Sequence, residues 1–261
     1  MKRIIFTVTN DLNYDQRMIR ICNSLVMAGY SVQLLGRKKR RSTALENQVF
    51  EQKRLYCYFE KGFAFYAEYN IRLFFYLLFA KADAFCCIDL DTMLPVYFNG
   101  KLRGKKLVYD AHEYFSQQKE IVTRLRIYGI WHFIEKNFVP RFRHGYTVSH
   151  SIATDFREKY GINFDVIMNA PLHRQLPAIA EKAENFILYQ GAVNEARGLE
   201  FLLPAMKDID TPLYIYGDGN YADQCRMLIA ANQLEGKVYM KGSVLPGQLE
   251  QITRQAMIGI N

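Results

Sequence analysis

Short apolar runs alternate with segments of helical periodicity along the first 170 residues. Residues 3–8 are β-branched and almost continuously apolar, which is typical of a parallel strand buried on both faces. Apolar residues then recur at helical spacing from Met18 to Val26, Gly29 ends this helix, and residues 31–35 again resemble a strand. Three further strand-like runs continue the alternation: residues 84–88, 106–109 and 145–148. The pattern predicts an α/β fold with a doubly wound parallel sheet.

A change of rhythm near residue 170 predicts a domain boundary. Residues 166–168 are expected to be the last strand of the first sheet, and residues 169–177 contain prolines and no periodicity. A second strand–helix pattern runs from residue 186 to residue 260. We therefore expect an N-terminal Rossmann-like domain at 1–170, a linker at 171–184 and a C-terminal Rossmann-like domain at 185–261. Because no helix follows its last strand, the second domain is expected to be incomplete.

The positive charge of the chain is concentrated in the first predicted domain. Residues 1–170 contain 26 Lys+Arg and 16 Asp+Glu, and residues 171–261 contain 8 and 10; the differences, +10 and −2, add up to the formal +8. A basic surface attracts nucleic acids, anionic lipid headgroups or phosphorylated substrates. Because no RRM, KH or helix-turn-helix pattern accompanies the charge, nucleic acid is not expected as a partner.

Cysteine usage indicates a reduced compartment. There are five cysteines, an odd number, and they form no C-x-x-C pair. The N-terminal residues do not resemble a signal peptide, so we expect free thiols and a cytoplasmic location. No zinc, P-loop or EF-hand pattern is found, and neither a metal nor a cofactor is expected.

The segment 61–80 is rich in aromatic residues, but Glu68 and Arg72 interrupt it, and it is short for a membrane span. It is either a core helix or an amphipathic helix that contacts an anionic membrane or a lipid-linked substrate, with help from the basic run 37–41. The second interpretation predicts peripheral contact with the inner face of the membrane.

Polar residues follow the strands of the first domain at the edge where open parallel sheets bind ligands. Such residues are also the ordinary content of connecting loops, so each has a purely structural interpretation. Their convergence favours a binding site, formed by Asn10, Asp15, Arg17, Asp89, Asp91, His112 and Glu113.

Glycines and one arginine follow the strands of the second domain. The loop 191–198 offers backbone N–H groups and the guanidinium of Arg197, which suit a phosphate. Alternatively, Gly191 and Gly198 only form the turn. Gly217, Gly219 and Gly242 follow the next two strands.

Together these motifs resemble the retaining GT-B glycosyltransferases of the group 1 type, especially bacterial enzymes of surface-polysaccharide assembly. The resemblance covers essentially the whole chain and rests on Asp15-x-Arg17, Asp89-Leu90-Asp91, Tyr109-Asp110-Ala111-His112-Glu113, Asn169-x-Pro171, Gly191-x(5)-Arg197-Gly198 and Gly217-Asp218-Gly219.

The resemblance implies two GT-B-like domains, with a nucleotide-sugar donor bound mainly by the second and a glycan or lipid-linked acceptor bound mainly by the first. It implies transfer with retention and without a metal. Arg197 then contacts the donor diphosphate beside Gly191, Gly198, Gly217, Gly219 and Gly242, and His112 is the catalytic residue that faces the transferred sugar.

Departures from the family pattern leave other functions open. No basic residue stands at Gly191 or Ala192, and the family's acidic E-x(7)-E element is expected beyond Asn261. A non-catalytic GT-B-like scaffold of a membrane-associated polysaccharide assembly system is one alternative. A nucleotide-sugar epimerase on the same fold is another.

Overall fold

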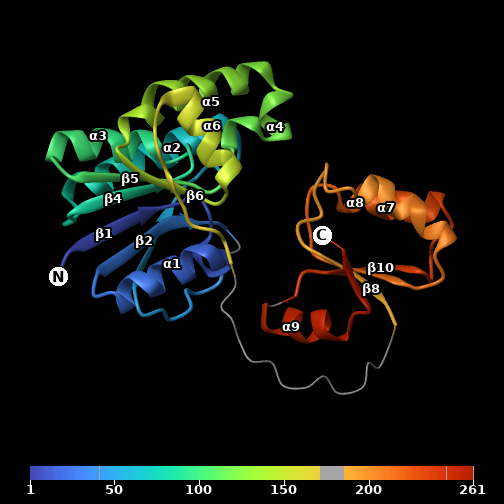
Figure 1. The fold of residues 1–261 in the computed structure, drawn as a ribbon. Coiled ribbons are helices and arrows are strands. Elements are labelled where there is room, and N and C mark those ends of the chain that lie inside the picture. Colours follow the sequence, from blue (N-terminus) through green and yellow to red (C-terminus); the bar gives the residue numbers. More distant parts are fainter. Residues whose placement is uncertain (41, 171–184, 245, 261) are drawn as a thin grey trace. The chain divides into compact units, whose positions relative to one another are not determined.

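The computed structural model describes residues 1–40, 42–170, 185–244 and 246–260. The chain forms two compact units, Met1–Pro171 and Leu172–Asn261 (Figure 1). The linker expected at 171–184 lies outside the described residues.

The first unit is built on a parallel sheet of seven strands in the order β3-β2-β1-β4-β5-β6-β7. The strand order reverses between β1 and β4, and such a switch point is where open α/β sheets place their ligands. The strands are β1 (Arg3–Thr7), β2 (Ser31–Lys38), β3 (Glu51–Tyr56), β4 (Ala84–Ile88), β5 (Lys106–Ala111), β6 (His144–Thr147) and β7 (Asp165–Val166).

Helices cover both faces of this sheet. Helix α1 lies on one face, whereas α2, α3 and α5 lie on the other (Figure 1). The distribution is what right-handed crossovers require, because the chain moves in opposite directions from β1 before and after the switch. The helices are α1 (Gln16–Met27), α2 (Gly62–Phe79), α3 (Met93–Arg103), α4 (Lys119–Val122), α5 (Leu125–Phe138) and α6 (His150–Tyr160).

Successive strand residues enter different cores, which explains the continuous apolar runs of the sequence. Ile5 and Cys87 pack in the core that holds α2 and α3, while their neighbours Phe6 and Cys86 pack in the core that holds α1. A strand covered on both sides needs apolar residues at every position. The predicted α/β fold with a doubly wound sheet is confirmed.

Strand β3 was not predicted. Its sequence, EQKRLY, is largely polar because it pairs only with β2 at the edge of the sheet. Its charged residues contact neighbouring elements: Glu51 pairs with Arg3, and Arg54 lies 3.2 Å from the carboxylate of Asp11.

The second unit has a parallel sheet of four strands in the order β10-β9-β8-β11. Ile187, Leu199, Leu213 and Cys225 are central to its separate core. The strands are β8 (Ile187–Gln190), β9 (Leu213–Tyr216), β10 (Val238–Gly242) and β11 (Ile258–Ile260), and the helices are α7 (Leu199–Ala205), α8 (Ala222–Ala231) and α9 (Pro246–Gln255).

Helix α2 is the aromatic segment of the sequence, and one of its faces belongs to the core. Phe65, Tyr69, Leu73 and Leu77, spaced four residues apart, are buried against the sheet. In the described part of the chain, no helix combines the length and hydropathy that a membrane span requires.

Candidate functional site

A pocket opens beside the ends of β1, β4 and β5 in the first unit, and its volume is about 190 Å³. All seven residues that the sequence assigned to the acceptor side and to catalysis line it: Asn10, Asp15, Arg17, Asp89, Asp91, His112 and Glu113. Val8, Thr9, Met18, Ile88, Phe115 and Gln118 complete the lining. The topology thus brings together side chains from three strand ends.

A buried ion pair holds Arg17, one of the residues that line this pocket. The guanidinium of Arg17, in the first turn of α1, donates two hydrogen bonds to the carboxylate of Asp110 near the end of β5, and the Nη2–Oδ1 distance is 2.8 Å. The Asp110 side chain is completely buried and that of Arg17 is only 6% exposed. Bidentate geometry offsets the desolvation of both ions, and neither is stable there alone.

The start of α1 is fixed by a cap. Asp15 accepts a hydrogen bond from the Met18 N–H at 3.1 Å and another from the Asn10 side chain, also at 3.1 Å. The Asn10 loop packs directly on β2, where a Cβ at Gly36 would lie 2.6 Å from the Asn10 carbonyl oxygen. Asp15 and Asn10 therefore shape the pocket wall and direct Arg17 inward.

His112 faces the carboxylate of Asp89. Its Nδ1 atom lies 3.9 Å from Asp89 Oδ2, and the imidazole is 34% exposed. Asp89 has a left-handed backbone, with φ of 53°, and accepts the Glu113 N–H at 3.2 Å. Burial, followed by the proximity of Asp91 and Asp110, raises the pKa of Asp89 well above its usual value. Asp89 thereby joins the ends of β4 and β5 beside the imidazole.

Asp91 accepts hydrogen bonds from the loop that follows β1 and from helix α2. The Thr9 hydroxyl donates to its carboxylate at 2.5 Å, and the Asn70 amide of α2 donates to its carbonyl oxygen at 2.9 Å. Burial raises the pKa of Asp91 to about 6, against the hydrogen bond from Thr9. The pocket consequently contains two carboxyl groups that bind protons more tightly than free aspartate.

Asp110 was missed as the partner of Arg17. A charged residue within an apolar strand run was the available signal, because such a residue requires a buried counter-ion. Nothing in the sequence marked Phe115 and Gln118 as pocket residues. They lie just after β5, and the Gln118 amide donates a hydrogen bond to the Glu113 carboxylate.

Glycines bring the strand ends of the second unit close together. The Gly191 N–H donates to Tyr216 O at 3.0 Å, and the Gly217 N–H donates to Gly242 O at 2.9 Å. A Cβ at Gly217 would lie 1.8 Å from the Gly191 carbonyl oxygen, and one at Gly219 would lie 2.3 Å from the Val193 carbonyl oxygen. These positions require glycine for packing, whatever ligand they hold.

Arg197 and Gly198 immediately precede α7. Gly198 has a φ of 80° and caps the helix, and the Arg197 side chain is exposed to solvent. The structure places all six predicted donor-side residues in the second unit, in the loops that follow β8 and β9 or at the end of β10.

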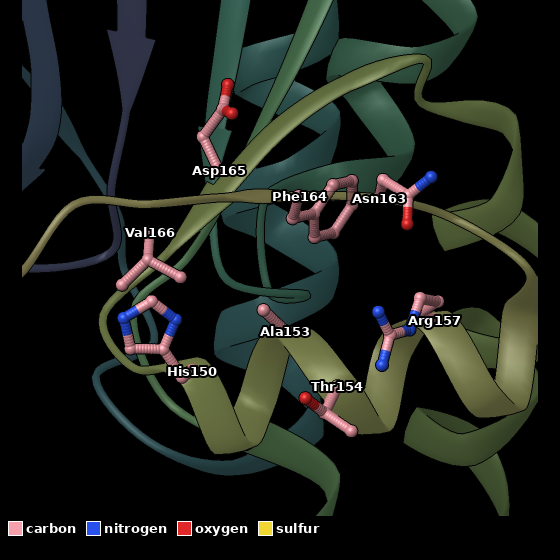
Figure 2. A pocket seen from close by; sticks show the side chains of 8 residues that line it. All are labelled: His150, Ala153, Thr154, Arg157, Asn163, Phe164, Asp165 and Val166. Atoms are coloured by element: carbon pink, nitrogen blue, oxygen red, sulfur yellow. The ribbon is translucent and has the colours of Figure 1, made fainter.

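A larger pocket of about 400 Å³ lies between α6 and β7 and contains none of the residues assigned above to the acceptor side, the donor side or catalysis. His150, Thr154 and Arg157 line it from the helix, whereas Asp165 points away from the helix (Figure 2). Its polar groups do not converge on one point, which distinguishes it from the pocket beside His112.

Solved structures show which class of fold this is. A sucrose-phosphate synthase from Thermosynechococcus elongatus superposes with a TM-score of 0.77 at 14% identity, over 99% of this chain and 75% of its own. Anabaena HepE, solved in complex with UDP and glucose, superposes with a TM-score of 0.74 at 14% identity, over 99% of this chain and 73% of its own. The lipopolysaccharide outer core galactosyltransferase WaaB superposes with a TM-score of 0.60 at 15% identity, over 98% of this chain and 72% of its own. The chain has the GT-B glycosyltransferase fold.

The family follows from the sequence of the first unit. The family described as Glycosyltransferase Family 4 matches residues 16–170, more than half of the chain, and the chain belongs to this family. No curated protein matches the chain in sequence.

Removing one partner of the buried ion pair is expected to destabilise the first unit. Arg17→Met leaves Asp110 buried without a counter-ion, which costs about 3–5 kcal/mol of unfolding free energy. Urea unfolding followed by Trp131 fluorescence measures this, because Trp131 is the single tryptophan and lies in α5.

The double variant Arg17→Met/Asp110→Asn is the control, since it removes both charges. We expect it to recover a large part of the lost stability. A loss below about 1 kcal/mol for Arg17→Met alone would show that the pair is not essential.

Asp91 is expected to lower the free energy of unfolding of the first unit as pH rises. Its folded pKa of about 6 lies above the free value of about 3.9, so the folded state binds the proton more tightly. This contribution is complete below the unfolded pKa and is lost as pH rises through 6. Relative to wild type, Asp91→Asn should gain about 1–2 kcal/mol between pH 5 and pH 8 in the same urea assay. A constant difference across that range would contradict the raised pKa.

Proposed function

We propose that this protein transfers a sugar, with retention and without a metal, from a nucleotide-sugar donor to a polysaccharide or lipid-linked acceptor on the cytoplasmic side of a membrane. The observation that carries the proposal is the pocket beside His112, in a chain that belongs to a glycosyltransferase family.

The pocket suits a sugar hydroxyl. Asp89, Asp91, His112 and Glu113 offer hydrogen-bond donors and acceptors at one sheet edge, and the rigid supports of Asp91 and Asp89 limit their movement. In the proposed reaction His112 orients the acceptor hydroxyl and the transferred sugar. Fixed polar groups of this kind lower the barrier by positioning the reactants.

The donor belongs to the second unit in this proposal. A leaving nucleoside diphosphate gains negative charge, which the exposed guanidinium of Arg197 is suited to stabilise. Gly191 and Gly198, in the loop that follows β8, are exposed to solvent on either side of the Arg197 position. HepE, which shares the fold, was solved with UDP and glucose, and UDP is therefore the first probe.

The acceptor class rests on charge and on the motif resemblance. The first unit has the excess of basic residues, which favours a phosphorylated or membrane-linked acceptor. A non-catalytic scaffold with the same fold would contact such a membrane without binding a nucleotide, and nucleotide binding separates the two functions.

Arg197→Ala is expected to weaken UDP binding by about tenfold or more, because a charge-assisted contact to the diphosphate is lost. Isothermal titration of the protein with UDP measures the dissociation constant.

Arg226→Ala is the matched control. Arg226 is an exposed arginine of α8 that pairs with Asp223 at 2.6 Å, and its loss should leave the UDP dissociation constant within about twofold. Equal binding by wild type and Arg197→Ala would refute the role of Arg197. Absence of binding to UDP and to the other nucleoside diphosphates by the full-length gene product would instead favour the scaffold.

A further inference from the structure

Helix α2 has a second apolar stripe that faces solvent. Ile71, Phe75 and Phe79 are 59%, 57% and 80% exposed and repeat every four residues. They are offset by two positions from the buried stripe of Tyr69, Leu73 and Leu77, which places them on the opposite side of the helix. A helix that serves only the core normally presents polar residues on that side.

Two neighbouring helices extend this stripe into a surface. Helix α3 packs on α2: Arg103 donates to Ala80 O at 2.7 Å, and Asn99 donates to Phe74 O at 3.1 Å. Helix α5 contacts α2 through Trp131 and Tyr66, whose ring centroids are 5.3 Å apart. The exposed large apolar residues of these three helices, here called the helix-layer surface, are Phe63, Ile71, Phe75, Phe79, Phe98, Leu102, Leu125, Ile127, Ile130 and Phe133.

The charges around the helix-layer surface are mainly positive. The three helices contain two acidic residues: Glu68, which pairs with Arg72, and Glu135, which is buried and accepts the Tyr160 hydroxyl. Basic residues remain exposed on the helices and at their ends: Lys61, Lys81, Lys101, Arg124, Arg126, Lys136 and Arg141. The exposed acidic residues next to the ends of α2 are Glu60 and Asp83, so basic residues remain in excess. Exposed apolar side chains with a mainly basic surround complement an anionic bilayer.

We propose that the helix-layer surface docks the protein on a bilayer that contains anionic lipids, with the apolar side chains of α2, α3 and α5 entering the headgroup region. A second copy of the chain fits the surface poorly, because residues 1–170 of both copies carry a net +10.

The surface is linked to the pocket by direct contacts. Phe115 lines the pocket and contacts Trp131 of α5, with ring centroids 5.0 Å apart. Asn70 of α2 holds the carbonyl of Asp91. A docked bilayer would therefore lie against the helices that support the pocket wall, as a lipid-linked acceptor requires. The docking extends the proposed function, but it is tested by membrane binding alone, so either proposal can fail without the other.

Vesicle co-sedimentation of the full chain tests the docking. Vesicles of phosphatidylcholine with phosphatidylglycerol should bind the wild type, and vesicles of phosphatidylcholine alone should bind it much less. Phe75→Glu/Phe79→Glu should lower the bound fraction by roughly tenfold or more, because apolar insertion is lost and two negative charges are added.

Met27→Glu/Val49→Glu is the matched control, with the same change of charge at residues 88% and 71% exposed outside the helix-layer surface. It should bind within about twofold of the wild type. Trp131 fluorescence in urea confirms that each variant is folded.

A second variant keeps the test valid if Phe75→Glu/Phe79→Glu does not fold. Lys101→Gln/Arg126→Gln also changes the charge by two and leaves the apolar residues in place; it should weaken binding to the anionic vesicles beyond the control. Failure of the wild type to bind them, or equal binding by the surface variants and the control, would overturn the proposal. Equal binding to both vesicle types would overturn the choice of an anionic bilayer.

Discussion

The ion pair between Arg17 and Asp110 is the constraint on which the site in the first unit depends. It connects the first turn of α1 to the end of β5 through two residues that are 93 positions apart in the chain. Because both charges are almost fully buried, each requires the other, and the register of α1 against the sheet is fixed by electrostatics as well as by packing. Asn10 and Asp15 then occupy one wall of the pocket, and His112 follows directly from β5.

Near this pair, the pocket contains two carboxyl groups whose pKa values are raised because the strand ends are buried. Asp89 and Asp91 are close in sequence and share one region of low solvent access, and for both, burial is the largest cause of the raised pKa. Both carboxyl groups therefore keep their protons to a higher pH than free aspartate does, and a carboxyl group can donate a hydrogen bond only while it is protonated. In the proposed function these groups would contact sugar hydroxyls.

Much of the fold could be predicted because strands that are buried on both faces require continuous runs of apolar residues, which are visible in the sequence. Residues 84–88 were predicted as a strand with the bounds that β4 has. The edge strand β3 could not be found in the same way, since an edge position imposes no apolar pattern on EQKRLY. The convergence of strand-end residues was also predictable, because parallel strands all end at one edge.

The partnerships within the site were not predictable. Nothing in the local sequence shows that Arg17 reaches Asp110, or that Asp15 caps a helix and holds Asn10, since these contacts depend on how elements pack in three dimensions. The exposed stripe of α2 is a similar case. Its aromatic composition was evident, but the structure was needed to separate Tyr69, which is buried, from Phe75, which is not.

Sugar transfer at the pocket beside His112 can be tested by measuring the turnover of a His112→Ala variant. The rate of UDP release from UDP-sugars in the presence of acceptor should fall roughly 100-fold, because the reacting groups lose their positioning. The UDP dissociation constant should not change, and His150→Ala, in the pocket beside α6, should behave as wild type. A His112→Ala variant that turns over within about twofold of the wild-type rate would refute the role of His112 in sugar transfer.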